Sequence, residues 1–356
     1  MKRKKIIFII ALLIILIGIS TVIIIDRINS KTATDSKEII EKEQEKVEKE
    51  TQENKGDDKI DIIDVNSKTR PYAIVVNNTP VAVKVQTGLN KAYIVYEFPT
   101  EGNTSRLMAL YKDINEDLTV GTTRSARHNF IDYALESDAI FVHFGWSKFA
   151  QADEKAGSIN YLNGLFDTPF WRENPENLAV EHTAYTSLGK IKQAVEKKGY
   201  KTETNTTTLL NYNTEDVDLS KIENAEVANT VTIPYGSSPN ITSFKYDSES
   251  KMYNRIENGT NCIDHKTKEQ VNTKNIIIQK INHTEGYKES KYWDLHTIGT
   301  GKGWFITNGY AVPIKWSKTS RNNKTKYTYL DGKEIEVSDG RTYIEIQTTK
   351  QNLIIE

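Results

Sequence analysis

The sequence contains almost no cysteine: Cys262 is the only one in 356 residues. A single thiol cannot close an intramolecular disulfide, so a disulfide-stapled fold is excluded and stability has to come from core burial. A lipid anchor is excluded as well, because it needs a cysteine directly after an N-terminal apolar run. Turn residues surround Cys262, and no helix start or basic pair is there to activate it, so we do not assign it as a nucleophile.

The signatures of metal, nucleotide and nucleic-acid binding are also missing. The six histidines show no paired ligand spacing, and neither a phosphate-binding loop nor a dinucleotide glycine fingerprint occurs. Residues 68–356 carry no net charge, whereas nucleic-acid binding needs a basic surface. We therefore expect no cofactor, no metal and no nucleic-acid partner.

The N-terminus holds a long apolar run. Ile6 to Ile25 is twenty residues without a charge, and it follows the basic tip Lys2-Arg3-Lys4-Lys5. At about 1.5 Å per residue the run spans the roughly 30 Å of a hydrocarbon core, and the basic tip should stay cytoplasmic. Residues 1–26 are thus predicted to be a single-pass membrane anchor with the remaining chain outside the membrane. A cleaved secretory signal is the alternative, but no small-x-small site closes the run.

A charged segment follows at residues 27–67. Ser30 to Ser67 contains seven lysines and twelve acidic residues. Such a segment has too little apolar surface to offset the entropy of ordering, and no sustained heptad pattern supports a coiled coil. We interpret it as a spacer that holds the following domains away from the membrane.

Residues 68–215 alternate strand and helix patterns. Alternating or buried apolar runs predict strands, and apolar stripes behind capping residues predict helices. The predicted strands are Tyr72 to Val76, Lys91 to Phe98, Ser105 to Tyr111 and Ala139 to Val142. The predicted helices are Arg124 to Leu135, Ser147 to Ala156, and one that begins at Thr186 or Ser187 and ends before Gly199.

Residues 216–356 lack helical signals and predict a mostly antiparallel β domain. Asn308-Gly309 and Asp331-Gly332 are hairpin turn sequences. The fold class expected for the whole chain is therefore α+β: a transmembrane helix, a mixed α/β domain and a β domain. The predicted strands are Val227 to Ile233, Ile241 to Tyr246, Lys251 to Glu257, Ile276 to Asn282, Tyr292 to Ile298, Gly303 to Thr307, Tyr310 to Trp316, Thr325 to Tyr329 and Thr342 to Gln347.

Three arginines near two glycines form the most site-like segment of the chain. Arg106 follows Glu101-Gly102-Asn103-Thr104-Ser105, and Arg124 and Arg127 lie in Gly121-Thr122-Thr123-Arg124-Ser125-Ala126-Arg127. Guanidinium groups match carboxylates and phosphates, and a helix beginning at Arg124 would put two of them on one face of its positive end. An internal ion network with Glu97 and Glu101 is the alternative. The predicted ligand-binding residues are Asn77, Asn78, Glu97, Thr104, Arg106, Arg124, Ser125 and Arg127.

These segments resemble the YerB-like family of extracytoplasmic proteins of Gram-positive bacteria. The resemblance is carried by Arg70-Pro71-Tyr72-Ala73-Ile74-Val75-Val76-Asn77-Asn78, Ala92-Tyr93-Ile94-Val95-Tyr96-Glu97, the two arginine segments, and Gly299-Thr300-Gly301-Lys302-Gly303. It implies two adjoining domains of uncharacterised function outside the cytoplasm. Many family members look like lipoproteins, whereas this chain has an apolar anchor. The family's Gly-Pro-Val before Arg-Ser-Ala-Arg is Gly121-Thr122-Thr123 here, and a Pro-His-Asn-like segment is Glu181-His182-Thr183.

Three residues could move protons if the site is catalytic. His143 ends a predicted strand, His182 follows Glu181, and Glu101 belongs to the arginine segment. For each histidine a hydrogen-bonded structural role is the alternative. Glu101, His143 and His182 are the candidate catalytic residues.

Three functions fit these features. The leading hypothesis is a membrane-anchored extracytoplasmic protein that binds an anionic cell-wall component or an envelope protein partner. The second is an envelope transferase or hydrolase acting on a phosphate-linked or carboxylate-bearing glycan. The third is a structural scaffold in which the arginines pair internally.

Overall fold

The computed structural model describes residues 59–236 and 240–356. The predicted anchor at Ile6 to Ile25 and most of the spacer lie outside the described residues. Within the described ranges, no helix is both long enough and apolar enough to cross a membrane. Lys59–Glu356 is one compact unit. Ile60 and Ile63, from the end of the predicted spacer, are buried in its core, so the packed chain begins before residue 68.

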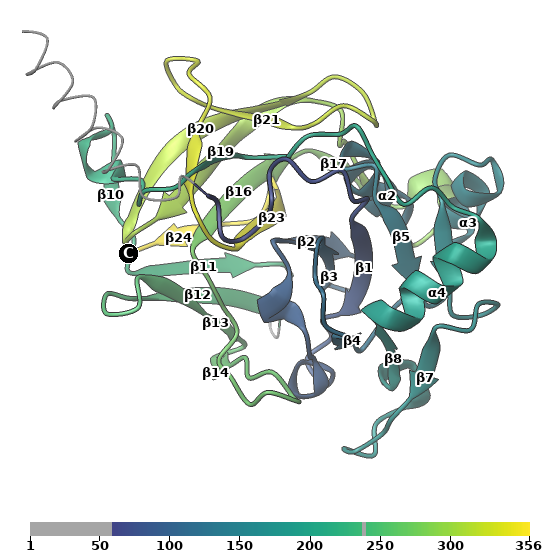
Figure 1. Cartoon of the computed structure of the whole chain (residues 1–356). Helices are drawn as coiled ribbons and strands as arrows, with labels where there is room; N and C mark the ends of the chain where they lie inside the picture. Colours follow the sequence, from purple (N-terminus) through teal and green to yellow (C-terminus); the bar gives the residue numbers. More distant parts are fainter. Residues whose placement is uncertain (1–58, 237–239) are drawn as a thin grey trace, which may run out of the picture. The chain divides into compact units, whose positions relative to one another are not determined.

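A large mixed sheet is the centre of this unit (Figure 1). Its strands come from both halves of the sequence, and β23 lies between β16 and β2, parallel to both. Along the sheet the order is β10 (Glu226–Val227), β20 (Tyr310–Lys318), β19 (Gly299–Thr307), β16 (Asn275–Ile281), β23 (Thr342–Thr348), β2 (Ile94–Thr100), β3 (Thr104–Tyr111), β1 (Tyr72–Asn77), β5 (Ile140–His143) and β6 (Tyr161–Asn163), with β21 (Lys326–Tyr329) beside β20.

Both faces of the large sheet are covered, which explains its nearly continuous apolar strands. On β1, Ala73 and Val75 belong to one core cluster, whereas Ile74 and Val76 belong to the other. Phe130 and Ile131 of a helix pack into the first cluster, and the second cluster is shared with a second sheet. Successive side chains of a strand point to opposite faces, so one strand supplies both cores.

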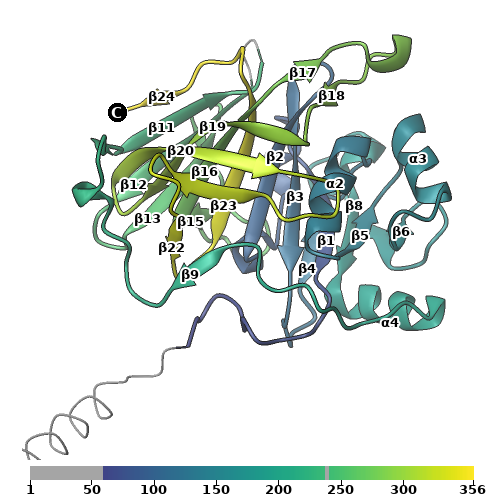
Figure 2. The same cartoon turned by 90° about the horizontal axis from the view of Figure 1, so that it is seen from above.

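The other sheets are smaller and lie around the large one (Figure 2). The second sheet contains β14 (Thr260–Asn261), β13 (Met252–Glu257), β12 (Ile241–Asp247), β11 (Thr230–Pro234) and β24 (Ile354–Ile355), with β15 (Asn272–Thr273) beside β13. The third contains β4 (Thr119–Gly121), β8 (Ala184–Ser187) and β7 (Phe170–Arg172). Two further pairs are β17 (His283–Thr284) with β18 (Asp294–Leu295), and β9 (Asn211–Asn213) with β22 (Glu336–Ser338).

The described residues contain three α-helices, which gather on one side of the unit (Figure 1). They are α2 (His128–Glu136), α3 (Lys148–Lys155) and α4 (Leu188–Lys198). The side chains of Ser147 and Ser187 cap α3 and α4, and Gly199 ends α4 in the left-handed conformation, as predicted. Short 3₁₀ helices occur at Val83–Val85, Leu89–Lys91, Val180–His182, Leu219–Lys221 and Tyr287–Glu289.

The prediction of a helix from Arg124 was wrong at its start, because α2 begins at His128. The backbone N–H of Arg124 donates to Val75, and that of Ala126 donates to Gly145. These bonds hold residues 124–127 extended, and Arg127 has β-region angles as the residue before the helix. Arg124 and Arg127 therefore do not share a helical face.

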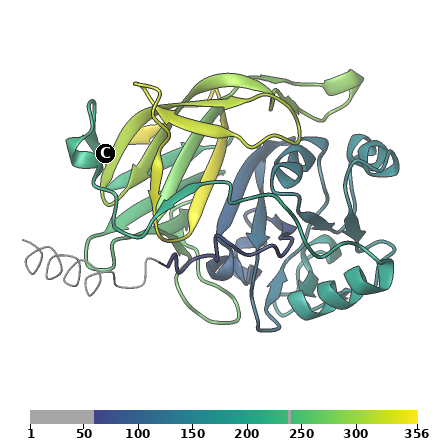
Figure 3. The ribbon, with the colours of Figure 1, turned by 45° about the horizontal axis from the view of Figure 1, so that its top comes forward.

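The predicted strand Tyr292 to Ile298 is reduced to the two residues of β18. Its first part packs on α2 instead of pairing in a sheet: the Trp293 carbonyl accepts a hydrogen bond from Asn129, and the Tyr292 ring lies 5.1 Å from the Arg127 guanidinium. In Figure 3 the chain around β17 and β18 reaches towards the helices.

The described part of the chain is β-rich with three helices, in agreement with an α+β class. The division into domains at residue 215 stays a prediction. The structure adds that one sheet runs through both proposed domains.

Candidate anion-binding site

Arg106, Arg124 and Arg127 lie close together although they come from different segments. The guanidinium of Arg106, on β3, donates to the Ser125 carbonyl at 2.7 Å, and Arg127 reaches the same carbonyl at 3.5 Å. The charges of Arg124 and Arg127 both lower the pKa of Arg106. We call these three side chains the arginine cluster.

Glu101 neutralises one member of the cluster. The Nε of Arg127 donates to both carboxylate oxygens of Glu101, at 3.1 and 3.0 Å, and a second guanidinium nitrogen also contacts that carboxylate. Burial tends to raise the pKa of Glu101, but the hydrogen bond and charge of Arg127 outweigh it and lower the pKa. Glu101 is thus ionised at neutral pH, which suits an ion pair better than a general acid.

Arg106 is the most buried member of the cluster, with 6% of its surface exposed. Its Nε has no hydrogen-bond partner in the described part of the chain. Burial, followed by the charge of Arg127, lowers its pKa well below the usual value. Burying a guanidinium with an unused donor costs free energy unless an anion accepts the missing hydrogen bond.

Arg124 is half-buried and only weakly engaged. One of its terminal nitrogens donates to the Glu181 carbonyl at 3.3 Å, and its Nε also lacks a partner within residues 59–236 and 240–356. Nearby, His182 Nδ1 lies 2.8 Å from the side-chain nitrogen of Asn77. Burial and the charge of Arg124 lower the pKa of His182, which favours the neutral imidazole.

A cavity of about 350 Å³ opens beside Arg124 and Ser125. Arg172 of β7 lines it and lies 4.7 Å from the ring of Phe144, while Leu165 and Val180 form part of an apolar wall. Sequence reasoning missed Arg172, because it lies on a three-residue strand with no motif around it. Tyr292, whose ring lies 5.1 Å from the Arg127 guanidinium, was not among the predicted ligand-binding residues.

The predicted ligand residues Glu97 and Asn78 lie elsewhere, in a buried polar network. Glu97 Oε2 is 3.0 Å from the Arg255 guanidinium, and both side chains are fully buried. Asn78 donates to Glu97 and to Ser105. The alternative that Glu97 neutralises the arginine cluster is therefore wrong, since its partner is Arg255, which the sequence analysis did not single out.

This network holds three carboxyl groups and one guanidinium. Arg255 also lies 2.9 Å from Glu257, and Glu345 of β23 stands beside Glu97 of β2 in register. Burial, then the Glu97 charge, raises the pKa of Glu345 well above normal, and Tyr235 hydrogen-bonds to it. Burial raises the pKa of Glu257 to about 7. Burial also raises the pKa of Cys262 to about 11, as suits an unreactive thiol.

The remaining predicted residues make local contacts. Thr104 and Thr100 hydrogen-bond to each other at 2.8 Å across the turn between β2 and β3. His143 is fully buried, with Nδ1 2.7 Å from the Gly145 carbonyl and Nε2 2.8 Å from Glu154. The structure thus brings together Asn77, Glu101, Arg106, Arg124, Ser125, Arg127 and His182, and it leaves Asn78, Glu97 and His143 in the interior.

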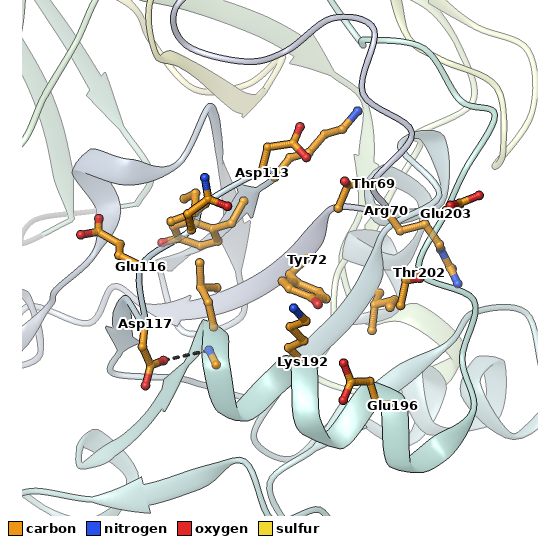
Figure 4. Close-up of a pocket in the computed structure, with 17 residues that line it drawn as sticks. Thr69, Arg70, Tyr72, Asp113, Glu116, Asp117, Lys192, Glu196, Thr202 and Glu203 are labelled. Carbon is orange, nitrogen blue, oxygen red and sulfur yellow. Dashed lines mark hydrogen bonds between the residues drawn. The ribbon is translucent and has the colours of Figure 1, made fainter.

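A larger cavity, of about 570 Å³, lies between β1, the loop after β3, and α4 (Figure 4). Three of its carboxylates already have partners: Asp117 accepts from the Gly189 N–H, Asp113 from Ser67, and Glu116 pairs with Lys91. None of the predicted site residues lines it. Within the described ranges, no group of three His, Cys, Asp or Glu side chains is arranged to hold a metal ion.

Comparison with known proteins gives consistent matches. Residues 61–201 match the domain described as "Protein of unknown function (DUF3048) N-terminal domain", and residues 231–344 match its C-terminal counterpart. YerB of Bacillus subtilis strain 168, named as a candidate lipoprotein, is 34% identical over 284 residues, which cover 79% of this chain and 82% of YerB. The crystal structure of YerB matches with a TM-score of 0.69 and 31% identity, covering 81% of this chain and 96% of that one.

Proposed function

Because this chain belongs to the YerB-like (DUF3048) family, we propose that it is an extracytoplasmic envelope protein that binds an anionic component of the cell wall through its arginine cluster. The observation that carries the proposal is the excess of positive charge around Arg106. After burial, the charges of Arg127 and Arg124 lower the pKa of Arg106, and the charge of Arg127 also lowers that of Arg124, while Glu101 forms its ion pair with Arg127.

A bound anion would accept hydrogen bonds from donors of the arginine cluster that have no partner. The Nε groups of Arg106 and Arg124 are buried donors without partners in the described chain. Phosphate and carboxylate groups accept bidentate hydrogen bonds from guanidinium, and such charge-assisted bonds are stronger than neutral ones. The neighbouring cavity, with Arg172 beside the Phe144 ring, offers room for the sugar or glycerol units of a polymer.

The proposed location rests on the N-terminal sequence and on the relative. Ile6 to Ile25 has the length of a membrane span, and YerB is named as a candidate lipoprotein, which implies attachment to a membrane from outside the cytoplasm. We propose that an apolar anchor replaces the lipid in this chain, with a charged segment between the membrane and the folded unit.

Binding is favoured over catalysis by the state of two of the three candidate acid–base groups, Glu101 and His143. Glu101 has a lowered pKa and is held by Arg127, and His143 has no exposed surface. Neither group is poised to exchange a proton with a substrate in the cavity. Turnover of a wall fragment by the purified chain, lost in Glu101→Gln, would favour the enzyme instead.

The test is retention of the purified full chain on an immobilised poly(glycerol phosphate). Arg124→Ala should weaken retention about tenfold, the effect of losing roughly 1.4 kcal/mol of a charge-assisted contact. Arg321→Ala is the matched control, because Arg321 is also partly exposed but pairs with Asp132 and Asp153. Equal retention of the folded Arg124 and Arg321 variants would refute the proposal.

A further inference from the structure

A third cavity, far from the arginine cluster in sequence, has two lysines as its charged lining side chains. It has a volume of about 380 Å³ and lies where β16 ends and β19 begins. Lys280 of β16, Lys302 of β19 and His296 line it, together with Thr300 and Thr349. No carboxylate of the described chain is among the lining residues.

The position of Lys280 is fixed by its surroundings. The indole N–H of Trp316, on β20, donates to the Lys280 carbonyl at 2.8 Å, and Trp316 stands opposite Gly301 in the β19–β20 register. A Cβ atom on Gly301 would overlap that indole, so this approach requires glycine. The packing of Trp316 therefore explains the glycine at position 301 of the Gly299-Thr300-Gly301-Lys302-Gly303 segment.

The ammonium group of Lys280 has little to balance its charge. Its Nζ donates to the Gln351 carbonyl at 2.7 Å, and half-burial lowers its pKa to about 8 without an opposing contribution from any carboxylate. The other charged side chain that lines the cavity is Lys302 from β19; His296 from the segment after β18 lines it as well, while the segment after β23 contributes Thr349 and the Gln351 carbonyl. With Lys280 and Lys302 and no carboxylate among its lining residues, the cavity is electrostatically positive.

We propose that this cavity is a binding site for an oxyanion, a phosphate or carboxylate group held by Lys280 with Lys302 and His296 at its rim. An ammonium group has three donors, so Lys280 can keep its bond to Gln351 and still contact the anion. The hydroxyl groups of Thr300 and Thr349 add neutral donors. The site does not depend on the arginine cluster, and the two can be tested separately.

The experiment measures acylation of lysines in the full chain by a limiting amount of acetic anhydride near pH 7, with peptide mapping. A bound anion raises the pKa of Lys280, and a rise of one pKa unit lowers its reactive, unprotonated fraction about tenfold at this pH. Inorganic phosphate and acetate are compared with chloride at equal ionic strength. Protection by phosphate or by acetate supports the proposal and identifies the preferred group.

Lys324 serves as the internal control. Burial also lowers its pKa, and its Nζ also donates to a carbonyl, that of Thr208, but the carboxylates of Glu334 and Glu136 act on it. Lys302→Ala should reduce the protection of Lys280, whereas Lys333→Ala, on an exposed turn, should not. Equal acylation of Lys280 in phosphate, acetate and chloride, or equal protection of Lys324, would overturn the proposal.

Discussion

At the scale of single residues, Arg255 is a buried guanidinium held by two buried carboxylates. It is fully buried and contacts Glu97 and Glu257 on two different sheets. Burial opposes its charge, but Cys262, Glu97 and Glu257 outweigh burial and raise its pKa. The network contains one guanidinium and three carboxyl groups, so its net charge depends on how many of the carboxyl groups are protonated.

The raised pKa of Glu257 predicts a pH-dependent stability. Its pKa rises from 4.5 to about 7 on folding, so between these values the folded chain holds a proton that the unfolded chain releases. Stability should therefore fall as pH rises through this range. Glu257→Gln keeps an oxygen that can accept from Arg255 and Thr242 but cannot ionise, so it should reduce this fall. Urea unfolding at about pH 5 and about pH 8 measures it.

Glu249→Gln is the control for this prediction, because Glu249 is exposed in the turn before β13. Its stability should follow the pH dependence of the unchanged chain. If Glu257→Gln loses stability between the two pH values as much as Glu249→Gln does, Glu257 does not take up the proton.

At the scale of elements, the position of β23 joins the two halves of the sequence. β23 has no exposed residue and lies parallel to β2 from the first half and β16 from the second. Without β23, β2 would present an unpaired edge and an uncovered Glu97. The halves are therefore expected to be one folding unit, although each matches its own family domain.

This expectation can be tested by producing residues 59–215 alone. The fragment lacks β23 and Arg255, so it should show no cooperative thermal transition and should tend to aggregate, whereas residues 59–356 should unfold in one transition. Circular dichroism and NMR dispersion measure the difference. A fragment that folds cooperatively would support the domain boundary predicted at residue 215.

Most elements could be predicted because they depend on local patterns. An apolar run predicted β1, alternation predicted β3, and Ser187 with Gly199 predicted both ends of α4. The start of α2 could not be found this way, because the bonds from Arg124 to Val75 and from Ala126 to Gly145 are long-range. The pairing of β23 with β2 could not be predicted either, because it joins residues that are far apart in the sequence.

At the scale of the whole molecule, the site was predicted only in part. Neighbours along the sequence suggested that Arg106, Arg124 and Arg127 would meet, and Arg106 and Arg127 both contact the Ser125 carbonyl. Glu97 was assigned to the same place by its closeness in sequence to Glu101. Its side chain instead points to the second sheet and meets Arg255, 158 residues away, which no local pattern reveals.

In the arginine cluster, Arg127 has one internal carboxylate partner, Glu101, and we propose that the cluster binds a second anion from outside the chain. Glu101 competes with any ligand for Arg127, since three contacts join the two side chains. Removing the charge of Glu101 should free Arg127 and increase the positive field at the site.

The most direct measurement is therefore the affinity of the full chain and its Glu101→Gln variant for soluble poly(glycerol phosphate), determined by calorimetry. We expect the variant to bind more tightly, by about threefold to tenfold, with a steeper dependence on salt. Misfolding can lower the affinity but cannot raise it, so a gain in affinity reports on the site itself. Weaker or unchanged binding by the folded variant would contradict the claim that the arginine cluster binds an anion.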